Sequence, residues 1–387
     1  MTGVGLWRLG FRPFYLGAAF FSGAAILLWI AAILGTNLLP NEAVITPLYW
    51  HAHEMVFGFA FAVIAGFLLT ASNNWTGILP AAGLPLAILF LFWSAARAFM
   101  LLGNVPLAAI CDGVFALLLT ALLFRVLWLA KLWKNFTLLG LVALLSAFNL
   151  WFYAIVLRGL PTSALWPIEL ALLMILQLLV IMGGRVIPMF TQNGILGIKV
   201  WKPQLLVTLT PIATALGIVG WIALPPRLAF VCCLGAALVN LVRWLGWKPW
   251  RTLQQPMVWG LQLGYLWIPV TLLCLGLESL GIVSRSLPLH ALAVGAMGLI
   301  IAGMITRTAM GHTGRPIVAT HIEQAFFVLI AVSALLRVLV ATPLLQSGLY
   351  STELLLASAL CWSLGFFLYF CRYAPWLFRP RLDGRPG

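Results

Sequence analysis

Residues 50–71 read WHAHEMVFGFAFAVIAGFLLTA, a stretch whose only acidic or strongly basic side chain is one glutamate. An α-helix rises 1.5 Å per residue, so this stretch would extend over about 33 Å and could cross a bilayer. The whole chain shares its character: of 387 residues, 63% are apolar and only 8% are charged. Soluble domains carry roughly a quarter charged residues, so this composition excludes a water-soluble enzyme, a disulfide scaffold and a disordered chain.

Twelve such stretches can be found along the chain, which predicts an all-α membrane protein with twelve transmembrane helices in one integral membrane domain, 1–387. Turn-forming segments such as Gly35-Thr36-Asn37 and Pro225-Pro226 separate them. The predicted spans are 14–35, 50–71, 83–102, 106–127, 136–157, 165–189, 205–223, 228–246, 257–276, 288–306, 322–341 and 350–371.

The basic residues predict the orientation. The chain has 22 Lys and Arg against 8 Asp and Glu, and a formal charge of +14. In a membrane protein this excess records topology rather than nucleic-acid binding, because cytoplasmic loops are enriched in Lys and Arg. With twelve spans, seventeen basic residues fall on one side and three on the other, while Arg97 and Arg337 fall inside spans. Both termini are therefore predicted to be cytoplasmic.

The second and tenth spans resemble each other at an offset of 237 residues. Seven of 25 positions are identical, and a weaker third copy follows in span six at an offset of 117. The spacing predicts three quasi-equivalent four-helix units, approximately 1–130, 131–255 and 256–387. Ordinary Gly-rich helix packing is the alternative, but it does not explain why a histidine recurs in register. The identical pairs are His53/His290, Gly58/Gly295, Ile64/Ile301, Ala65/Ala302, Gly66/Gly303, Thr76/Thr313 and Gly77/Gly314.

The recurring histidines are the first candidates for a functional site. In the predicted topology His53 and His290 lie at similar depth near the outer face and would face one another across the bundle. Two opposed imidazoles can hold haem iron as an axial pair, and Gly58 and Gly295 would leave room for the macrocycle. The alternative is that each ring is a polar tip reaching water at the membrane interface.

His51 is a candidate for a second metal. It lies about 200° around the helix from His53, so the two side chains would not share one ion. Glu54 or Met55 would lie on its face, and a histidine with a thioether suits copper. A plain interfacial role is again the alternative.

Polar residues also gather at the predicted cytoplasmic ends of spans two, six and ten. Arg185, Arg307, His312 and Arg315 could converge there on an anion, a haem propionate or a second metal, and His321 follows at the start of span eleven. Membrane anchoring by basic residues is the alternative.

Arg97 and Arg337 are predicted to lie within the membrane, where an unpaired arginine is costly. Each should therefore have a carboxylate partner, and a haem propionate would qualify.

At several motifs the sequence resembles the NnrS family of bacterial membrane proteins. The resemblance covers nearly the whole chain and implies a polytopic inner-membrane protein that contains haem and copper and is associated with nitric oxide and denitrification. The motifs are Trp50-His51-Ala52-His53-Glu54-Met55, Asn74-Trp75-Thr76-Gly77, Gly183-Gly184-Arg185-Val186-Ile187-Pro188, His290-Ala291 and Gly311-His312-Thr313-Gly314-Arg315-Pro316.

A more distant likeness links the architecture to subunit I of the haem-copper oxidases. Those enzymes also have twelve helices in three units, with low-spin haem ligands on helices two and ten, where His53 and His290 stand here. The departure is in spans six and seven, which lack the histidines of the binuclear centre. Oxygen or nitric oxide reduction of that type is therefore not implied.

The sequence leads to one functional hypothesis and two alternatives. The first is a haem- and copper-binding protein of the bacterial inner membrane that protects cells from nitric oxide by sensing, binding or redox chemistry. A twelve-helix secondary transporter is one alternative. A transporter of this kind is expected to carry carboxylates near the midplane of the bilayer. The other is a mononuclear-haem oxidoreductase that takes electrons from a quinol or cytochrome.

Overall fold

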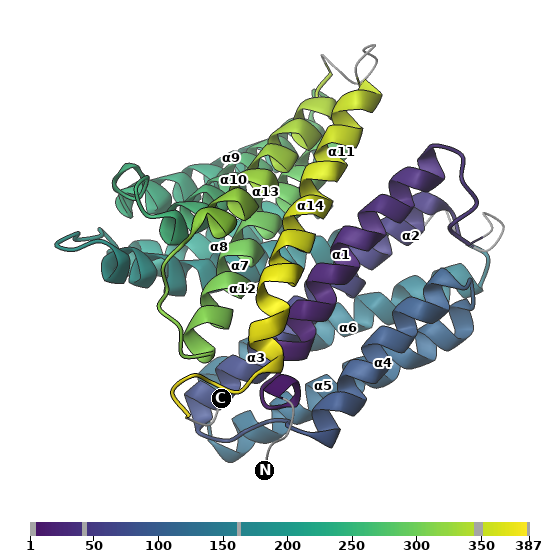
Figure 1. Ribbon diagram of the computed structural model, residues 1–387. Helices are drawn as coiled ribbons and strands as arrows, with labels where there is room; N and C mark the ends of the chain where they lie inside the picture. The colour runs from purple at the N-terminus through teal and green to yellow at the C-terminus, as the bar shows by residue number, and fades with distance from the viewer. Residues whose placement is uncertain (1–4, 41–44, 161–163, 344–350, 385–387) are drawn as a thin grey trace. The chain divides into compact units, whose positions relative to one another are not determined.

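The computed structural model describes residues 5–40, 45–160, 164–343 and 351–384. All regular structure within these ranges is helical (Figure 1). Twelve of the helical runs are long and apolar enough to cross a membrane, which confirms the predicted fold class. In chain order they are α1 (Phe11–Ile33), α2 to α3 (Pro47–Thr76), α4 (Leu84–Leu101), α5 (Val105–Leu129), α6 (Phe136–Leu157), α7 (Leu165–Gly194), α8 (Gln204–Ala223), α9 (Pro226–Gly246), α10 (Pro256–Ser279), α11 to α12 (Ser286–His312), α13 (His321–Val340) and α14 (Ser351–Phe378).

Each predicted span overlaps one of these runs. The second, tenth and twelfth spans continue several residues further than predicted, into polar sequence that hydropathy alone excludes from a span. Position 350, the predicted start of the last span, lies outside the described residues.

Local sequence explains several helix ends. The side-chain oxygens of Thr46, Asn104 and Thr320 accept backbone N–H groups in the first turns of α2, α5 and α13. At the other end of span two, Gly77 adopts φ +70° and its N–H donates to the Asn73 carbonyl at 2.8 Å. Glycine suits this position because a left-handed conformation closes the helix without a Cβ clash.

Spans two and ten both contain a π-helical segment. The first covers Glu54–Ala60 and the second covers Ala291–Met297, and each begins one residue after a histidine, His53 or His290. The first residues of the two segments are therefore 237 positions apart, and so are the last residues. This is the same offset that aligns the sequences of the two spans. π-Helices are rare and occur often at functional sites, so their shared register is a structural correspondence independent of the sequence identities.

The same correspondence continues at the ends of the two spans. Thr76 and Thr313 each donate to the carbonyl oxygen four residues earlier, both at 2.7 Å. Gly77 and Gly314 both adopt left-handed backbone, with φ of +70° and +76°. By contrast α7, which carries the weaker third copy, is α-helical throughout. The organisation in three equivalent units stays a prediction.

The chain divides into two compact units, which we describe separately. Unit 1 comprises the described residues within 1–171, 307–316 and 366–387, and unit 2 those within 172–306 and 317–365. In unit 1, α1 packs along α3 and the first π-helical segment, and α5 packs against α3, α4 and α6 (Figure 1). Phe14 of α1 fixes part of this packing, because its ring contacts Phe90, Trp93 and Phe115.

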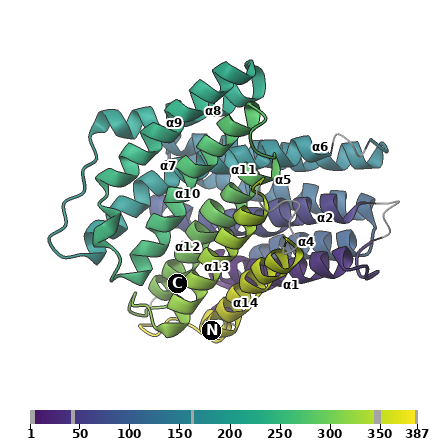
Figure 2. The same cartoon turned by 90° about the horizontal axis from the view of Figure 1, so that it is seen from above.

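Unit 2 is built around α10. This helix packs against α9 and against the second π-helical segment, while α8 packs on the other side of α9 (Figure 2). Helices approach closely at Gly264, where a Cβ would lie 2.9 Å from the backbone nitrogen of Ile300. Gly235 on α9 has no atom within 4 Å of the same position and is exposed. Only the first of these glycines is needed for helix packing.

This difference gives a matched test of the fold. Gly264→Ala is expected to lower the stability of the detergent-solubilised protein by about 1–3 kcal/mol, because the new methyl group meets backbone that cannot move away freely. Gly235→Ala should be neutral or stabilise by up to about 1 kcal/mol, since alanine is the better helix former. Thermal unfolding followed by circular dichroism measures both. Equal effects of the two substitutions would show that α10 does not pack as described.

Candidate functional site

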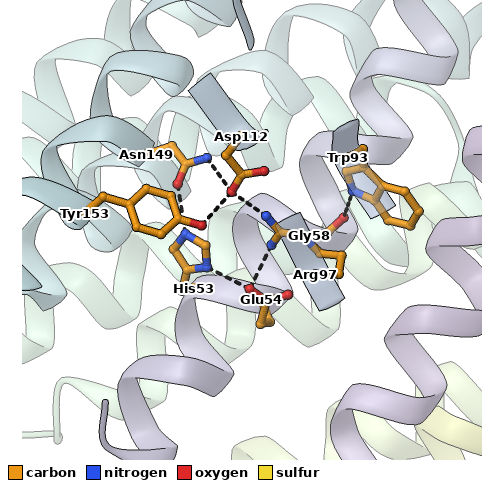
Figure 3. Close-up of polar contacts among 8 residues, drawn as sticks. All are labelled: His53, Glu54, Gly58, Trp93, Arg97, Asp112, Asn149 and Tyr153. Carbon is orange, nitrogen blue, oxygen red and sulfur yellow. Dashed lines mark hydrogen bonds and ion pairs between the residues drawn. The ribbon is translucent and has the colours of Figure 1, made fainter. Parts of the chain in front are cut away.

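Six polar side chains form a buried cluster inside unit 1 (Figure 3). None is more than 5% exposed, and burial of such groups is costly unless each finds a partner. Together they are called the His53 network. Its members are His53, Glu54, Arg97, Asp112, Asn149 and Tyr153.

Arg97 of α4 joins the two carboxylates of the network. Its Nη1 donates to Oε1 of Glu54 at 2.8 Å, and its Nη2 donates to Oδ2 of Asp112 on α5. The same Asp112 oxygen accepts from Asn149 Nδ2 at 3.1 Å and from the Tyr153 hydroxyl at 2.8 Å. Asn149 and Tyr153 are four residues apart and so share one face of α6. The sequence predicted a carboxylate for Arg97, and the protein itself supplies two.

His53 faces an oxygen atom at each ring nitrogen. Nδ1 lies 2.9 Å from Glu54 Oε1, and Nε2 lies 2.8 Å from Asn149 Oδ1. The amide nitrogen of Asn149 is engaged with Asp112, so its oxygen must be the atom that faces the ring. The ring thus bridges the Glu54 carboxyl group and the Asn149 amide, and so joins the second span to α6.

Aromatic rings enclose His53. Phe152 stacks on the imidazole with centroids 4.4 Å apart, and Tyr153 and Phe57 contact it at 5.0 and 5.2 Å. Water is therefore kept from the ring, and the electrostatic interactions of the network act in a medium of low dielectric.

The glycines beside the two histidines do not leave space for a macrocycle. A Cβ on Gly58 would meet Phe21 at 2.6 Å and Arg97 Nη1 at 3.0 Å, and one on Gly295 would meet Trp267 at 2.5 Å. The prediction that these glycines make room for haem is therefore wrong. Gly58 instead admits the Arg97 guanidinium to the network, and its carbonyl accepts a hydrogen bond from Trp93 Nε1 at 2.9 Å (Figure 3).

His51 occupies a different environment from His53. Its ring stacks on Trp29 of α1 with centroids 4.1 Å apart and an interplanar angle of 20°. The two histidines therefore contact different helices, α1 and α6, as their angular separation predicted. Glu54, expected on the face of His51, lies instead with His53 and Arg97, and Met55 is half-buried in the π-helical segment.

His290 is held by its own first turn in unit 2. Its Nδ1 lies 2.8 Å from the Ser286 carbonyl oxygen and 3.1 Å from the Ser286 hydroxyl. Arg337 of α13 donates from Nη2 to the same hydroxyl at 3.1 Å. No carboxylate among the described residues contacts Arg337. The Arg337 guanidinium and the His290 imidazole thus both contact the Ser286 hydroxyl.

The predicted cytoplasmic cluster is only partly assembled within one unit. Arg307, His312 and Arg315 belong to unit 1, whereas Arg185 and His321 belong to unit 2. The His312 ring contacts Phe11 with centroids 5.5 Å apart, and Arg315 stacks on an aromatic ring of α14. His321 is exposed at the start of α13.

Sequence reasoning missed four buried polar residues. The sequence did not single out Asp112 or Arg243 as buried, yet they are only 1% and 5% exposed. Arg243 donates to the Val180 carbonyl at 3.1 Å and to a tyrosine hydroxyl at 3.3 Å. Asn149 and Tyr153 were not considered. The available signal was a polar pair four residues apart on an otherwise apolar helix.

Removing the central charge should expose how the network is stabilised. Arg97→Met leaves two buried carboxylates without the guanidinium that joins them, and we expect a loss of about 3–5 kcal/mol in stability. Arg125→Met, at an exposed position on α5, should change stability by no more than about 0.5 kcal/mol.

The double variant Arg97→Met/Asp112→Asn should recover part of that loss, because one of the two carboxylates left without Arg97 is then replaced by a neutral amide. Thermal and denaturant unfolding in detergent measure all three proteins. A double variant no more stable than Arg97→Met would contradict charge balance as the stabilising factor.

Among the described residues, no group of three or more His, Cys, Asp and Glu side chains could hold a metal ion. A comparison with curated proteins gave no match. A comparison with protein families matches the NnrS protein family over residues 5–381, which include both histidine motifs and the whole His53 network. With twelve candidate membrane spans and a match over nearly its full length, the chain is a multi-pass membrane protein of the NnrS family.

Proposed function

We propose that this protein acts in the bacterial response to nitric oxide, in the inner membrane, by sensing, binding or redox handling of nitric oxide. Family membership and the membrane-spanning helical fold support this role. We further propose haem as its cofactor, with copper as a second one, and a quinol or cytochrome as an electron donor if the protein turns over.

The observation that carries the haem proposal is the hydrogen bonding of His290. Metal-bound histidines usually donate one ring N–H to a carbonyl or carboxylate, which fixes the tautomer and leaves the other nitrogen for the metal. The 2.8 Å contact from Nδ1 to the Ser286 carbonyl resembles that supporting hydrogen bond, and it supports His290 as the proposed ligand.

Arg337 supports the same site. It is half-buried, it reaches Ser286, and no described carboxylate contacts it. An arginine in this setting fits the propionate of a haem, as the sequence suggested. When bound, haem would supply an iron atom that binds nitric oxide, and the protein would position it and exclude water.

His53 does not fit a haem ligand in the arrangement described. Its Nδ1 contact with Glu54 resembles a supporting hydrogen bond, but Nε2 faces Asn149 at 2.8 Å. Ligation through Nε2 would require the Asn149 amide to move away from the ring. His53 as the second ligand is therefore proposed only for an arrangement in which that amide has moved.

Copper fits less well. The described residues around His51 provide an aromatic stack and no cluster of ligating groups. Copper at His51 rests on the histidine and thioether pattern of the sequence and on family membership, and copper at His312 and His321 rests on family membership.

One observation favours a second candidate, a proton-coupled transporter. Such proteins hold ionisable residues in the interior of their membrane-spanning segments, and Glu54 and Asp112 are both buried inside unit 1. The His53 network could then carry a coupling proton.

Visible spectroscopy distinguishes these functions. Purified wild type, grown with haem and copper available, is expected to show a haem signal that is lost in His290→Ala, because the ligating nitrogen is removed. Arg337→Gln should retain haem but bind it about tenfold more weakly, since one charge-assisted contact is lost. Haem content is measured by pyridine haemochromogen and copper by mass spectrometry.

His53→Ala and Asn149→Ala are the informative comparisons. Loss of haem in His53→Ala but not in Asn149→Ala would make His53 a ligand. Haem retained in both His53→Ala and His290→Ala would reject the histidine pair. Wild type without haem would reject the haem proposal and favour the transporter, which proton uptake into proteoliposomes then tests.

A further inference from the structure

Six arginines gather at one end of unit 1, where the start of α1, the end of α12 and the end of α14 meet. These segments are far apart in the sequence but belong to one compact unit. We call these residues the arginine cluster. They are Arg8, Arg12, Arg315, Arg372, Arg379 and Arg381.

Hydrogen bonds to the backbone hold the three segments together. Arg12, which is fully buried, donates from Nη1 to the carbonyl oxygens of Leu377 at 2.9 Å and Arg379 at 2.8 Å. The Leu382 N–H donates to the Thr313 carbonyl at 3.2 Å. The cluster is therefore built into the fold rather than carried on loose tails.

An aromatic ring positions two of the cations. The guanidinium groups of Arg315 and Arg372 both lie over the ring of Trp376, at 4.3 and 4.4 Å from its centroid. Cation–π contacts of this length hold both guanidinium groups in place beside the same ring.

The positive charges are close enough to repel one another. Arg8, Arg315 and Arg381 all act on the charge of Arg12. Partial burial lowers the pKa of Arg315, and the neighbouring charges of Arg372 and Arg379 lower it further.

Among the described residues of these segments, Asp383 is the only acid, and it is engaged by Arg381 at 2.6 and 2.8 Å. Arg8, Arg315 and Arg379 have no carboxylate partner among the described residues. The cluster therefore concentrates positive charge that its own described side chains do not neutralise.

We propose that the arginine cluster binds a phosphate group, either the headgroup of an anionic phospholipid or inorganic phosphate. Guanidinium groups match phosphate oxygens in charge and in donor geometry. Basic clusters next to membrane helices recognise anionic lipid headgroups in the same way. The site is separate from the His53 network and from His290, and it does not depend on the proposed function.

General membrane anchoring predicts something different. Arg125, Lys131 and Lys134 of the same unit are also basic, but all three are exposed and no described contact gathers them. Anchoring by charge alone would make both sets contribute equally to the binding of anionic lipid. A built phosphate site would make only the arginine cluster contribute. Variants that remove the same amount of charge from each set therefore distinguish the two explanations.

The experiment uses the full chain in a neutral maltoside detergent. Binding of phosphatidylglycerol is titrated by native mass spectrometry for wild type, for Arg8→Gln/Arg315→Gln/Arg379→Gln and for Arg125→Gln/Lys131→Gln/Lys134→Gln. The arginine-cluster variant should bind about 100-fold more weakly, at roughly a fivefold loss per arginine. The control variant should lose less than about threefold.

A second arm distinguishes the source of the phosphate. Thermal unfolding is measured with inorganic phosphate and with chloride at equal ionic strength. Phosphate that stabilises wild type but not the arginine-cluster variant, without lipid binding, would assign the site to inorganic phosphate. The single variant Arg379→Gln, whose side chain is exposed, should bind about fivefold more weakly and covers the case in which the triple variant does not fold.

Equal losses in the two triple variants would overturn the proposal. So would wild type that binds neither phosphatidylglycerol nor phosphate.

Discussion

The ion bridge from Arg97 to Glu54 and Asp112 is the interaction on which the best-defined part of this protein depends. It links α4, α5 and the second span in a region where most other contacts are between apolar side chains that could slide past one another. Buried charges cannot be left unpaired, so the bridge specifies which helix faces meet. Asn149 and Tyr153 extend that constraint to α6, and His53 lies between Glu54 and Asn149.

Much of the fold follows from composition, whereas the site follows from packing. The twelve spans were predictable because an apolar run of bilayer length has few alternatives. A carboxylate for Arg97 was predictable for a similar reason, but its identity was not, because Asp112 and Asn149 lie on helices that the sequence does not relate to span two. The burial of Arg243 was not predictable, because a basic residue near a helix end usually faces water. In this protein the side chain of Arg243 is buried.

The repeated histidines show how far two related helices can diverge. His53 and His290 begin matching π-helical segments, and matching threonines and glycines end both spans. Their surroundings nevertheless differ in kind. His53 lies among carboxylates and aromatic rings, whereas His290 is held by Ser286 beside Arg337. The two spans thus share a backbone conformation, whereas the groups that contact the two histidines differ.

The π-helical segments also affect how sequences of this kind should be read. Each turn within Glu54–Ala60 holds an extra residue, because the backbone hydrogen bonds span five residues instead of four. A helical wheel drawn through the segment at 3.6 residues per turn therefore accumulates an error of about 100°, the angle of one residue. Sequence comparisons that infer facing residues across either segment need a one-residue correction at this point.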